Sequence, residues 1–318
     1  MSGTIARMSE EIKYQIDDLP AFSRYLASLG ALPDSETTGS NCVFVGAGDS
    51  FAAAKAAEYL SGFRARALDP YDLLLNPEIV EGKHVFVISV SGRTRTNIEA
   101  ARAVRGIAKR ITAITSDLRS VLAETCDDVI KLNFRKAHGL TPGTVSFTTT
   151  LLACYSRVRD LAPITDLRQV FDSCIKWADS IELPDEGTVF IVGTGLSYCM
   201  AIYGAAKIYE VLGWKSHYQG TEQFSHMELF SLAERDAVLL IPDSTEDRKI
   251  AQLEGLLDRG GWNVAKINLA NRDQVVRSIH TGMHLQVLAL RTALRLGFEE
   301  CSFMRKEKHL RISDAMIY

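Results

Sequence analysis

A short apolar run that ends in a glycine-rich turn occurs twice in this chain of 318 residues. The stretch Val43–Ser50 is echoed by Val189–Ser197. The run that starts at His84 is echoed by one that starts at Ala237, and residues 111–115 are echoed by residues 264–268 at the same offset. A duplication on this scale constrains the fold strongly, because it predicts two lobes of similar build.

Strand-like and helix-like segments alternate within each lobe, which favours a parallel sheet. The run His84–Val90 is almost wholly Val, Phe and Ile, as expected of a strand buried on both faces. The sequence therefore predicts an α/β fold with two doubly wound parallel-sheet lobes. Expected strands span 42–45, 84–90, 110–115, 128–132, 189–192, 237–241 and 264–268. No counterpart of the strand at 128–132 is found beyond residue 269, so we expect a smaller second sheet.

Helices are expected at 8–29, 51–60, 97–109, 118–124, 148–161, 167–180 and 285–296. The first has apolar residues at every third or fourth position, with an interruption at Pro20. The expected organisation is an N-terminal helix and linker (1–39), a first lobe with connecting helices (40–180), a second lobe (181–300) and a C-terminal tail (301–318).

Composition excludes several classes of protein. Thirty-six basic and 39 acidic residues leave a net charge of −3, which argues against a general binder of nucleic acid or anionic membranes. The six cysteines form no CxxC pair and no zinc-like cluster, so we expect reduced thiols that mostly fill core space. No apolar run reaches the roughly 18 residues that span a bilayer, and no signal-like segment opens the chain. We expect a cytoplasmic protein.

Three hydroxyls surround the turn after the strand that starts at His84. Ser89, Ser91 and Thr94 flank Gly92 just before a predicted helix, and Arg93 and Arg95 add positive charge. Small hydroxyls and the free amides of a helix start suit a phosphate or similar oxyanion. The competing interpretation is ordinary N-capping by Ser or Thr. In an α/β lobe, where ligands bind at the carboxyl ends of the strands, we favour the anion site.

The loop Gly46-Ala47-Gly48-Asp49-Ser50 is not a dinucleotide fingerprint, because Phe51 stands where the third glycine would be needed. A P-loop is also absent. We therefore expect no nucleotide cofactor, and the lack of a zinc-like cluster predicts no metal.

These features together resemble the sugar isomerase (SIS) domain family. The resemblance covers residues 40–300 and is strongest to tandem-SIS proteins: the isomerase half of glucosamine-6-phosphate synthase, and stand-alone hexosamine-phosphate deaminases and deglycases. It implies a sugar-phosphate ligand held by Ser89, Ser91 and Thr94. It also implies that Gly48 and Ser50, in the first loop, touch the substrate.

The resemblance also implies catalytic residues in the second lobe. The helix Gly204-Ala205-Ala206-Lys207-Ile208-Tyr209-Glu210 follows a family pattern in which Glu210 is the catalytic carboxylate and Lys207 its neighbouring cation. His226, in Glu222-Gln223-Phe224-Ser225-His226, takes the place of the histidine that opens the sugar ring. Glu222 is assigned to substrate binding. From the residues alone, the alternative for Lys207 and Glu210 is a plain i,i+3 ion pair. For His226 the residues alone favour a satisfied loop histidine.

Some positions depart from the family pattern. Met227 and Glu228 replace Gly-Pro after His226, and Lys306, Lys308 and Arg311 are alternatives for the lysine of the family's tail. An amidotransferase domain is not expected, since residue 2 is serine rather than a nucleophilic cysteine.

The resemblance implies an aldose–ketose isomerase or aminosugar-6-phosphate deaminase that works by enediol or enolamine proton transfer. It also implies a homodimer, because the family completes its site with a neighbouring subunit. The alternative is a non-catalytic sugar-phosphate sensor.

Overall fold

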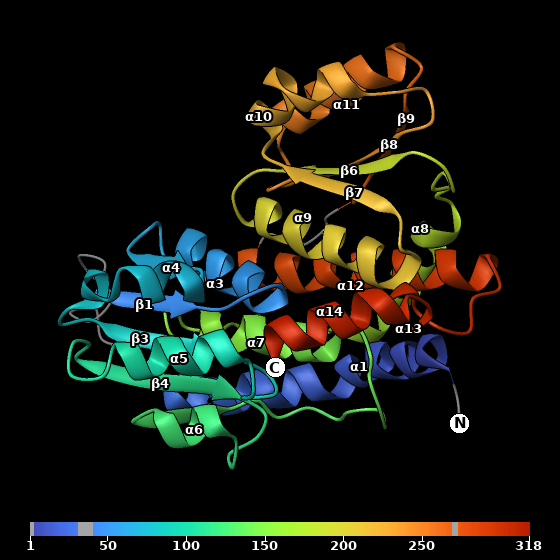
Figure 1. Ribbon diagram of the computed structural model, residues 1–318. Coiled ribbons are helices and arrows are strands. Elements are labelled where there is room, and N and C mark those ends of the chain that lie inside the picture. The colour runs from blue at the N-terminus through green and yellow to red at the C-terminus, as the bar shows by residue number, and fades with distance from the viewer. Residues whose placement is uncertain (1–2, 31–40, 269–272) are drawn as a thin grey trace. The chain divides into compact units, whose positions relative to one another are not determined.

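The computed structural model describes residues 3–30, 41–268 and 273–318. The linker expected between the first helix, which ends at residue 29, and the first strand at 42 therefore lies mostly outside the described residues. The model contains two parallel sheets, with helices between their strands (Figure 1). This confirms the predicted α/β class with two doubly wound lobes.

The chain divides into two compact units. The first-sheet unit comprises Asp17–Arg135, Val145–Ile164 and Lys308–Tyr318. The second-sheet unit comprises Met1–Ile16, Lys136–Thr144 and Thr165–Glu307. The expected domains are continuous in sequence, whereas both units are assembled from separate segments. The reason is packing: α7 (Val145–Tyr155) packs on α3 (Asp49–Leu60), and α8 (Leu167–Asp179) packs on α12 (Gln274–Arg295).

The first sheet has five strands in the order β2-β1-β3-β4-β5, all parallel. They are β1 (Cys42–Val45), β2 (Ala65–Leu68), β3 (His84–Ile88), β4 (Arg110–Thr115) and β5 (Asp128–Lys131). One face packs on α4 (Pro70–Leu75), α5 (Arg95–Ala103) and α6 (Val121–Thr125) through a core of aliphatic side chains. A short 3₁₀ turn, η2 (Pro77–Val80), leads into β3. Burial on both faces explains why β1 and β3 are solid apolar runs.

The second sheet has four strands in the order β7-β6-β8-β9, so the smaller second sheet is confirmed. They are β6 (Thr188–Gly193), β7 (Lys215–Gln219), β8 (Ala237–Ile241) and β9 (Asn263–Lys266). Figure 1 shows α9 (Leu196–Lys207) on one face, with α10 (Thr221–His226) and α11 (Arg248–Arg259) on the other. The remaining elements are η3 (Ile208–Leu212), η4 (Glu228–Ser231), α13 (Ser302–Arg305) and α14 (Glu307–Ile317).

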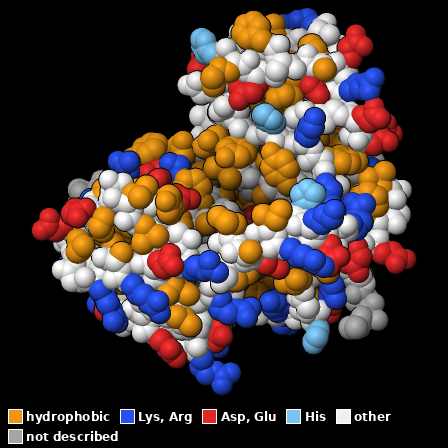
Figure 2. Space-filling view, viewed as in Figure 1, with side chains coloured by type: hydrophobic (Ala, Val, Ile, Leu, Met, Phe, Trp, Pro, Cys, Tyr) orange, Lys and Arg blue, Asp and Glu red, His pale blue; other side chains and the backbone are white. Residues whose placement is uncertain are grey.

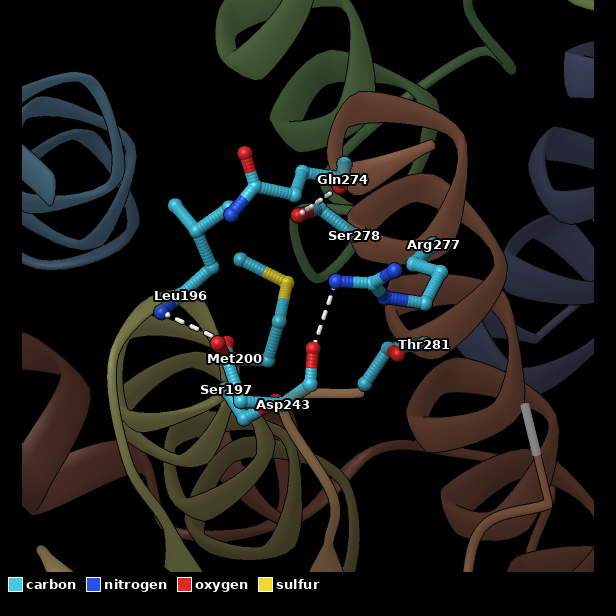
Figure 3. A pocket seen from close by; sticks show the side chains of 8 residues that line it. All are labelled: Leu196, Ser197, Met200, Asp243, Gln274, Arg277, Ser278 and Thr281. Carbon is cyan, nitrogen blue, oxygen red and sulfur yellow. Dashed lines mark hydrogen bonds between the residues drawn. The ribbon is translucent and has the colours of Figure 1, made fainter. Parts of the chain in front are cut away.

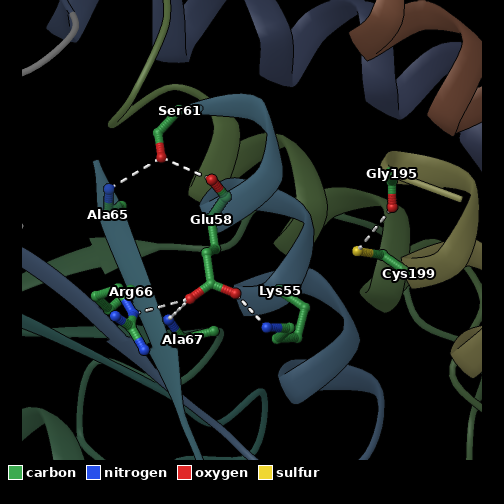
Figure 4. Close-up of polar contacts among 8 residues, drawn as sticks. All are labelled: Lys55, Glu58, Ser61, Ala65, Arg66, Ala67, Gly195 and Cys199. Carbon is green, nitrogen blue, oxygen red and sulfur yellow. Dashed lines mark hydrogen bonds and ion pairs between the residues drawn. The ribbon is translucent and has the colours of Figure 1, made fainter. Parts of the chain in front are cut away.

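Two of the edge strands, β2 and β7, are absent from the expectations. β2 is only four residues long, and side chains at the end of α3 fix its place (Figure 4). The buried Glu58 carboxylate accepts hydrogen bonds from the Arg66 side chain and the Ala67 amide, both at 3.2 Å, and pairs with Lys55. Such contacts leave no periodic signal in the strand's own sequence.

α1 (Thr4–Leu29) is one helix that continues past Pro20, so the interruption expected at this proline is wrong. Its apolar face explains the continuity, because Leu19 and Phe22 on either side of the proline are buried. Packing of this kind offsets the backbone hydrogen bond that proline removes.

Surface and thiol chemistry agree with the composition. Acidic and basic side chains are interspersed over the face in view in Figure 2, in keeping with the small net charge. All six cysteines lie within the described ranges and are free thiols, and five of them are buried. No helix in the described part of the chain combines the length and apolarity needed to cross a bilayer.

Two histidines lie one turn apart on the core helix α12. Among the described residues, the buried Nε2 of His280 has no hydrogen-bond partner. His284 is buried, and its Nδ1 lies 2.8 Å from the His280 carbonyl oxygen. Burial lowers the pKa of His280 to about 4, and burial also lowers the pKa of His284.

These pKa shifts predict acid sensitivity. Between pH 6.5 and about 4 the unfolded chain binds protons that folded His280 does not, so the free energy of unfolding falls as the pH falls. In His280→Gln we expect the free energy of unfolding to fall less on acidification than in the wild-type protein, by up to about 3 kcal/mol. Urea unfolding at pH 7 and pH 4.5 measures the difference. His309→Gln, on the exposed helix α14, is the control, and an unchanged loss in His280→Gln would contradict the prediction.

Candidate functional site

Two loops leave the carboxyl ends of neighbouring strands in the first-sheet unit. One follows β1 and holds Gly48 and Ser50; the other follows β3 and holds Ser89–Thr94. The strands pair in parallel, with Val45 opposite Val87. The sheet order reverses direction between β1 and β3, and open α/β sheets bind ligands at such a switch point. The topology therefore places both predicted substrate loops at one edge.

The first loop needs its glycines. Gly48 precedes α3 with φ 58° and ψ −128°, a backbone conformation that side chains disfavour. A Cβ on Gly46 would lie 2.8 Å from the Cβ of Ser50. Ser50, partly exposed in the first turn of α3, is thus held close to the end of β1.

The second loop is tied together by its own hydroxyls. The Oγ of Ser89 lies 2.9 Å from the Oγ1 of Thr94 and accepts a hydrogen bond from the Gly92 amide at 3.1 Å. The Oγ of Ser91 accepts one from the Arg93 amide at 3.3 Å. Gly92 has φ +64°, and a Cβ there would lie 2.0 Å from the Oγ of Ser120. The three predicted hydroxyls therefore lie on one compact turn.

The capping interpretation of this turn is not supported. Thr94 is the N-cap residue of α5, yet its side chain accepts no hydrogen bond from the helix amides. The first helical hydrogen bond runs from the Ile98 amide to the Thr94 carbonyl oxygen at 3.1 Å. A helix start without a side-chain cap keeps amide donors and a positive dipole end for another acceptor, such as an anion.

The duplicated turn of the second-sheet unit is capped by a carboxylate. At the position that corresponds to Thr94, Asp247 is the N-cap residue of α11. Its carboxylate accepts hydrogen bonds from the Ile250 amide at 3.1 Å and from the Asp243 amide at 3.0 Å. This helix start already holds a negative charge, which would repel a second anion.

The start of α9 holds a carboxylate as well (Figure 3). Gly195 precedes this helix with φ 64° and ψ −131°, nearly the conformation of Gly48. The Leu196 amide donates to the Asp243 carboxylate at 3.1 Å, and Arg277 donates to the Asp243 carbonyl oxygen at 2.5 Å. Burial raises the pKa of Asp243, while bonds from nearby backbone amides and the charge of Arg277 lower it. The cavity left here is about 10 Å³, roughly room for one water.

Lys207 and Glu210 form an ion pair in the second-sheet unit. The lysine Nζ lies 2.5 Å from the glutamate Oε2; the lysine side chain is 0% exposed and the glutamate 36%. Lys207 ends α9, and Glu210 lies in the π-helical turn η3 that follows. Single π turns often occur at functional sites, because the wider turn redirects side chains. The i,i+3 ion pair expected as an alternative therefore exists, and one of its members is fully buried.

His226 and Glu222 lie on α10 and are exposed, with 71% and 61% of their side chains accessible. The His226 Nε2 lies 3.5 Å from a Glu222 oxygen. Lys249 pairs with the other Glu222 oxygen at 2.9 Å, and this hydrogen bond is the main reason that the pKa of Glu222 is lowered. The structure brings these two predicted residues together, but on an open surface.

Of the predicted tail residues, Lys306 donates to the Gly213 carbonyl oxygen at 3.2 Å, just after η3. Lys308 and Arg311 are exposed on α14. Their assignment to the site stays a prediction.

Comparisons with known proteins agree with this architecture. No protein-family model matches the chain. Over 213 residues it is 24% identical to glutamine–fructose-6-phosphate aminotransferase (isomerizing) of Caldanaerobacter subterraneus subsp. tengcongensis, covering 60% of the chain. The match spans 35% of that curated relative, about a third of its length. Glucosamine-6-phosphate deaminase from Thermotoga maritima superposes with a TM-score of 0.77 at 20% identity, covering 92% of this chain and 95% of the deaminase.

Tagatose-6-phosphate ketose/aldose isomerase from Escherichia coli superposes with a TM-score of 0.75 at 16% identity, covering 94% and 96% of the two chains. The C-terminal domain of glucosamine-fructose-6-phosphate aminotransferase from Francisella tularensis superposes with a TM-score of 0.66 at 17% identity, covering 91% of this chain and 95% of that domain. The chain has the tandem SIS fold. The predicted resemblance is thus confirmed for the fold and for the relationship in sequence to the isomerizing aminotransferase.

The two N-cap positions provide a matched test of the site geometry. Asp247→Ala removes a real cap, so we expect the free energy of unfolding to fall by about 1 kcal/mol. Thr94→Ala removes no cap and should cost less than half as much. Urea unfolding, with amide hydrogen exchange of α5 and α11, measures both. Equal losses in the two variants would show that Thr94 is an ordinary cap.

Proposed function

We propose that this chain is a phosphosugar isomerase or aminosugar-6-phosphate deaminase. Ser89, Ser91 and Thr94, with Gly48 and Ser50, would bind the phosphate of the sugar. The observation that carries this proposal is the contrast between two equivalent helix starts: α5 in the first lobe begins at Thr94 without a side-chain cap, whereas the corresponding residue of the second lobe, Asp247, caps α11 with its carboxylate. The ligands named for the neighbours, which include glucosamine 6-phosphate and tagatose 6-phosphate, support a sugar-phosphate substrate.

The proposed reaction moves a proton between C1 and C2 of the open-chain sugar. Glu210 takes the proton from one carbon and returns it to the other, through an enediol or enolamine, with no net oxidation. Lys207, held at 2.5 Å from Glu210, supplies positive charge for the developing oxyanion. With an aminosugar, the product imine adds water and releases ammonia.

His226 is proposed to open the sugar ring, and Glu222 to orient it or contact the sugar. The exposure of His226 is compatible with a role against a second copy of the chain, so the proposal includes a homodimer. The same exposure, with Met227 and Glu228 directly after it, favours the second candidate: a sugar-phosphate sensor that binds without turnover.

Phosphate binding tests the proposed site directly. Removing a hydroxyl that contacts a charged ligand costs about 1.5–3 kcal/mol, so we expect Ser89→Ala to raise the dissociation constant of glucosamine 6-phosphate about tenfold or more. Ser244→Ala, at the position of the second lobe that corresponds to Ser91, should leave it unchanged. Isothermal titration calorimetry measures both. Equal affinity of the wild-type protein and Ser89→Ala for glucosamine 6-phosphate would show that the phosphate does not bind at the proposed site in the first lobe.

Turnover separates the enzyme from the sensor. We expect ammonia release from glucosamine 6-phosphate, or aldose formation from fructose 6-phosphate, and a fall in kcat of about 100-fold or more in Glu210→Gln. Glu254→Gln, which breaks a Lys–Glu pair elsewhere in the second lobe, is the control. Unchanged activity in Glu210→Gln would refute the assignment of the base. Binding without turnover of either sugar would favour the sensor.

A further inference from the structure

Glu11 is a buried carboxylate that the proposed chemistry does not use. It lies on α1 and is 2% exposed. Its oxygens accept hydrogen bonds from the Ala137 amide at 3.1 Å, the Thr141 hydroxyl at 2.9 Å and the Thr144 hydroxyl at 3.1 Å. All of these donors lie on the segment between β5 and α7, which has no helix or strand of its own. We call residues 137–144 the clamped loop.

The clamped loop contacts α9 on its other side. The Tyr203 hydroxyl donates to the Gly143 carbonyl oxygen at 2.7 Å. Tyr203 is fully buried, and the Nζ of Lys207 lies 4.9 Å from the centre of its ring. Lys207 in turn holds Glu210. A continuous series of contacts within the second-sheet unit thus joins Glu11 to the proposed base.

Burying a carboxylate is costly, and burial raises the pKa of Glu11 above its ordinary value, while the threonine and amide donors lower it. Its hydrogen-bond partners in the described structure are hydroxyls and an amide, and all of them belong to the clamped loop. A carboxylate can accept from every one of them, whereas a glutamine of nearly the same shape has a single acceptor oxygen. The two acceptor oxygens of Glu11 therefore hold the loop.

We propose that Glu11 is a positioning residue, which holds the clamped loop against Tyr203 and thereby fixes the placement of Lys207 and Glu210. This role rests on the proposed function, because the expected effect of losing it is a lower kcat. A misplaced catalytic group loses rate while the phosphate remains bound by other residues. The assignment is thus specific: Glu11 should affect kcat and leave phosphate affinity unchanged.

The test uses variants that separate positioning from stability. The one acceptor oxygen of Gln in Glu11→Gln can serve either the two threonine hydroxyls or the Ala137 amide, so at least one buried donor loses its acceptor, and stability should fall as well as kcat. Adding Thr141→Val and Thr144→Val removes those hydroxyls and should restore most of the stability without restoring the clamp. We expect this triple variant to keep wild-type affinity for inorganic phosphate and to lose about tenfold to 100-fold in kcat.

Two further variants complete the series. Tyr203→Phe deletes only the hydroxyl that meets the loop and should lower kcat in the same way. Glu10→Gln, an exposed neighbour on α1, is the control and should change neither kcat nor stability. Wild-type kcat in the triple variant would overturn the proposal.

Amide hydrogen exchange gives a readout that needs no activity. Loss of protection in residues 137–144 of Glu11→Gln, with Glu10→Gln unchanged, is the expected result. If the exchange rates of residues 137–144 are the same in Glu11→Gln and Glu10→Gln, Glu11 does not hold the clamped loop, and this conclusion does not depend on whether the protein turns over a sugar phosphate. If the loop loosens but the wild-type protein turns over no sugar phosphate, the clamp stands and the proposed function fails.

Discussion

Backbone amides at the start of a helix need an acceptor, and the two lobes of this protein meet that need differently. In the first lobe, Thr94 begins α5 without capping it and directs its hydroxyl to Ser89. In the second lobe, Asp247 caps α11, and Asp243 accepts from the first residue of α9. Both choices follow one electrostatic rule, because a helix start attracts negative charge from a side chain or from a ligand. The duplicated fold thus leaves the start of α5 without a side-chain cap in the first lobe, whereas a carboxylate caps its counterpart α11 in the second.

Charged groups inside the molecule are held by partners placed around them. Lys207 is fully buried beside Glu210, Glu58 holds the edge strand β2, and Glu11 holds the clamped loop. Each such group is costly to bury, and breaking its contacts leaves a buried charge or donor without a partner. These groups therefore stabilise one arrangement of an irregular segment, which apolar packing alone does not specify. In the second lobe, Lys207 and Glu210 are the residues that the proposal assigns to proton transfer, and Glu11 is joined to them through the clamped loop and Tyr203.

The apolar strands and the glycine turns could be predicted from the sequence because their causes are local. β1, β4 and β8 lie at the predicted bounds, and β3 and β6 within a residue or two of them, since strands buried on both faces are mostly apolar. The edge strands β2 and β7 were missed because their residues are mixed in polarity and their pairing depends on neighbours. The continuity of α1 through Pro20 was missed for a similar reason, since packing on both sides overrides the local signal.

The sequence by itself determined the duplicated α/β architecture and the smaller second sheet. It also placed the hydroxyl turn next to a helix, because the period of apolar residues and the need for glycine at positive φ are written in neighbouring residues. Only the tertiary structure decided that Thr94 does not cap its helix, that carboxylates occupy the second copy, and that Glu11 holds the clamped loop. The bond between Asp243 and the start of α9, and the clamp, join residues distant in the chain, and no local pattern encodes such a pairing. Thr94 and Asp247 are both residue types that can cap a helix, and only the side-chain geometry shows which of them does.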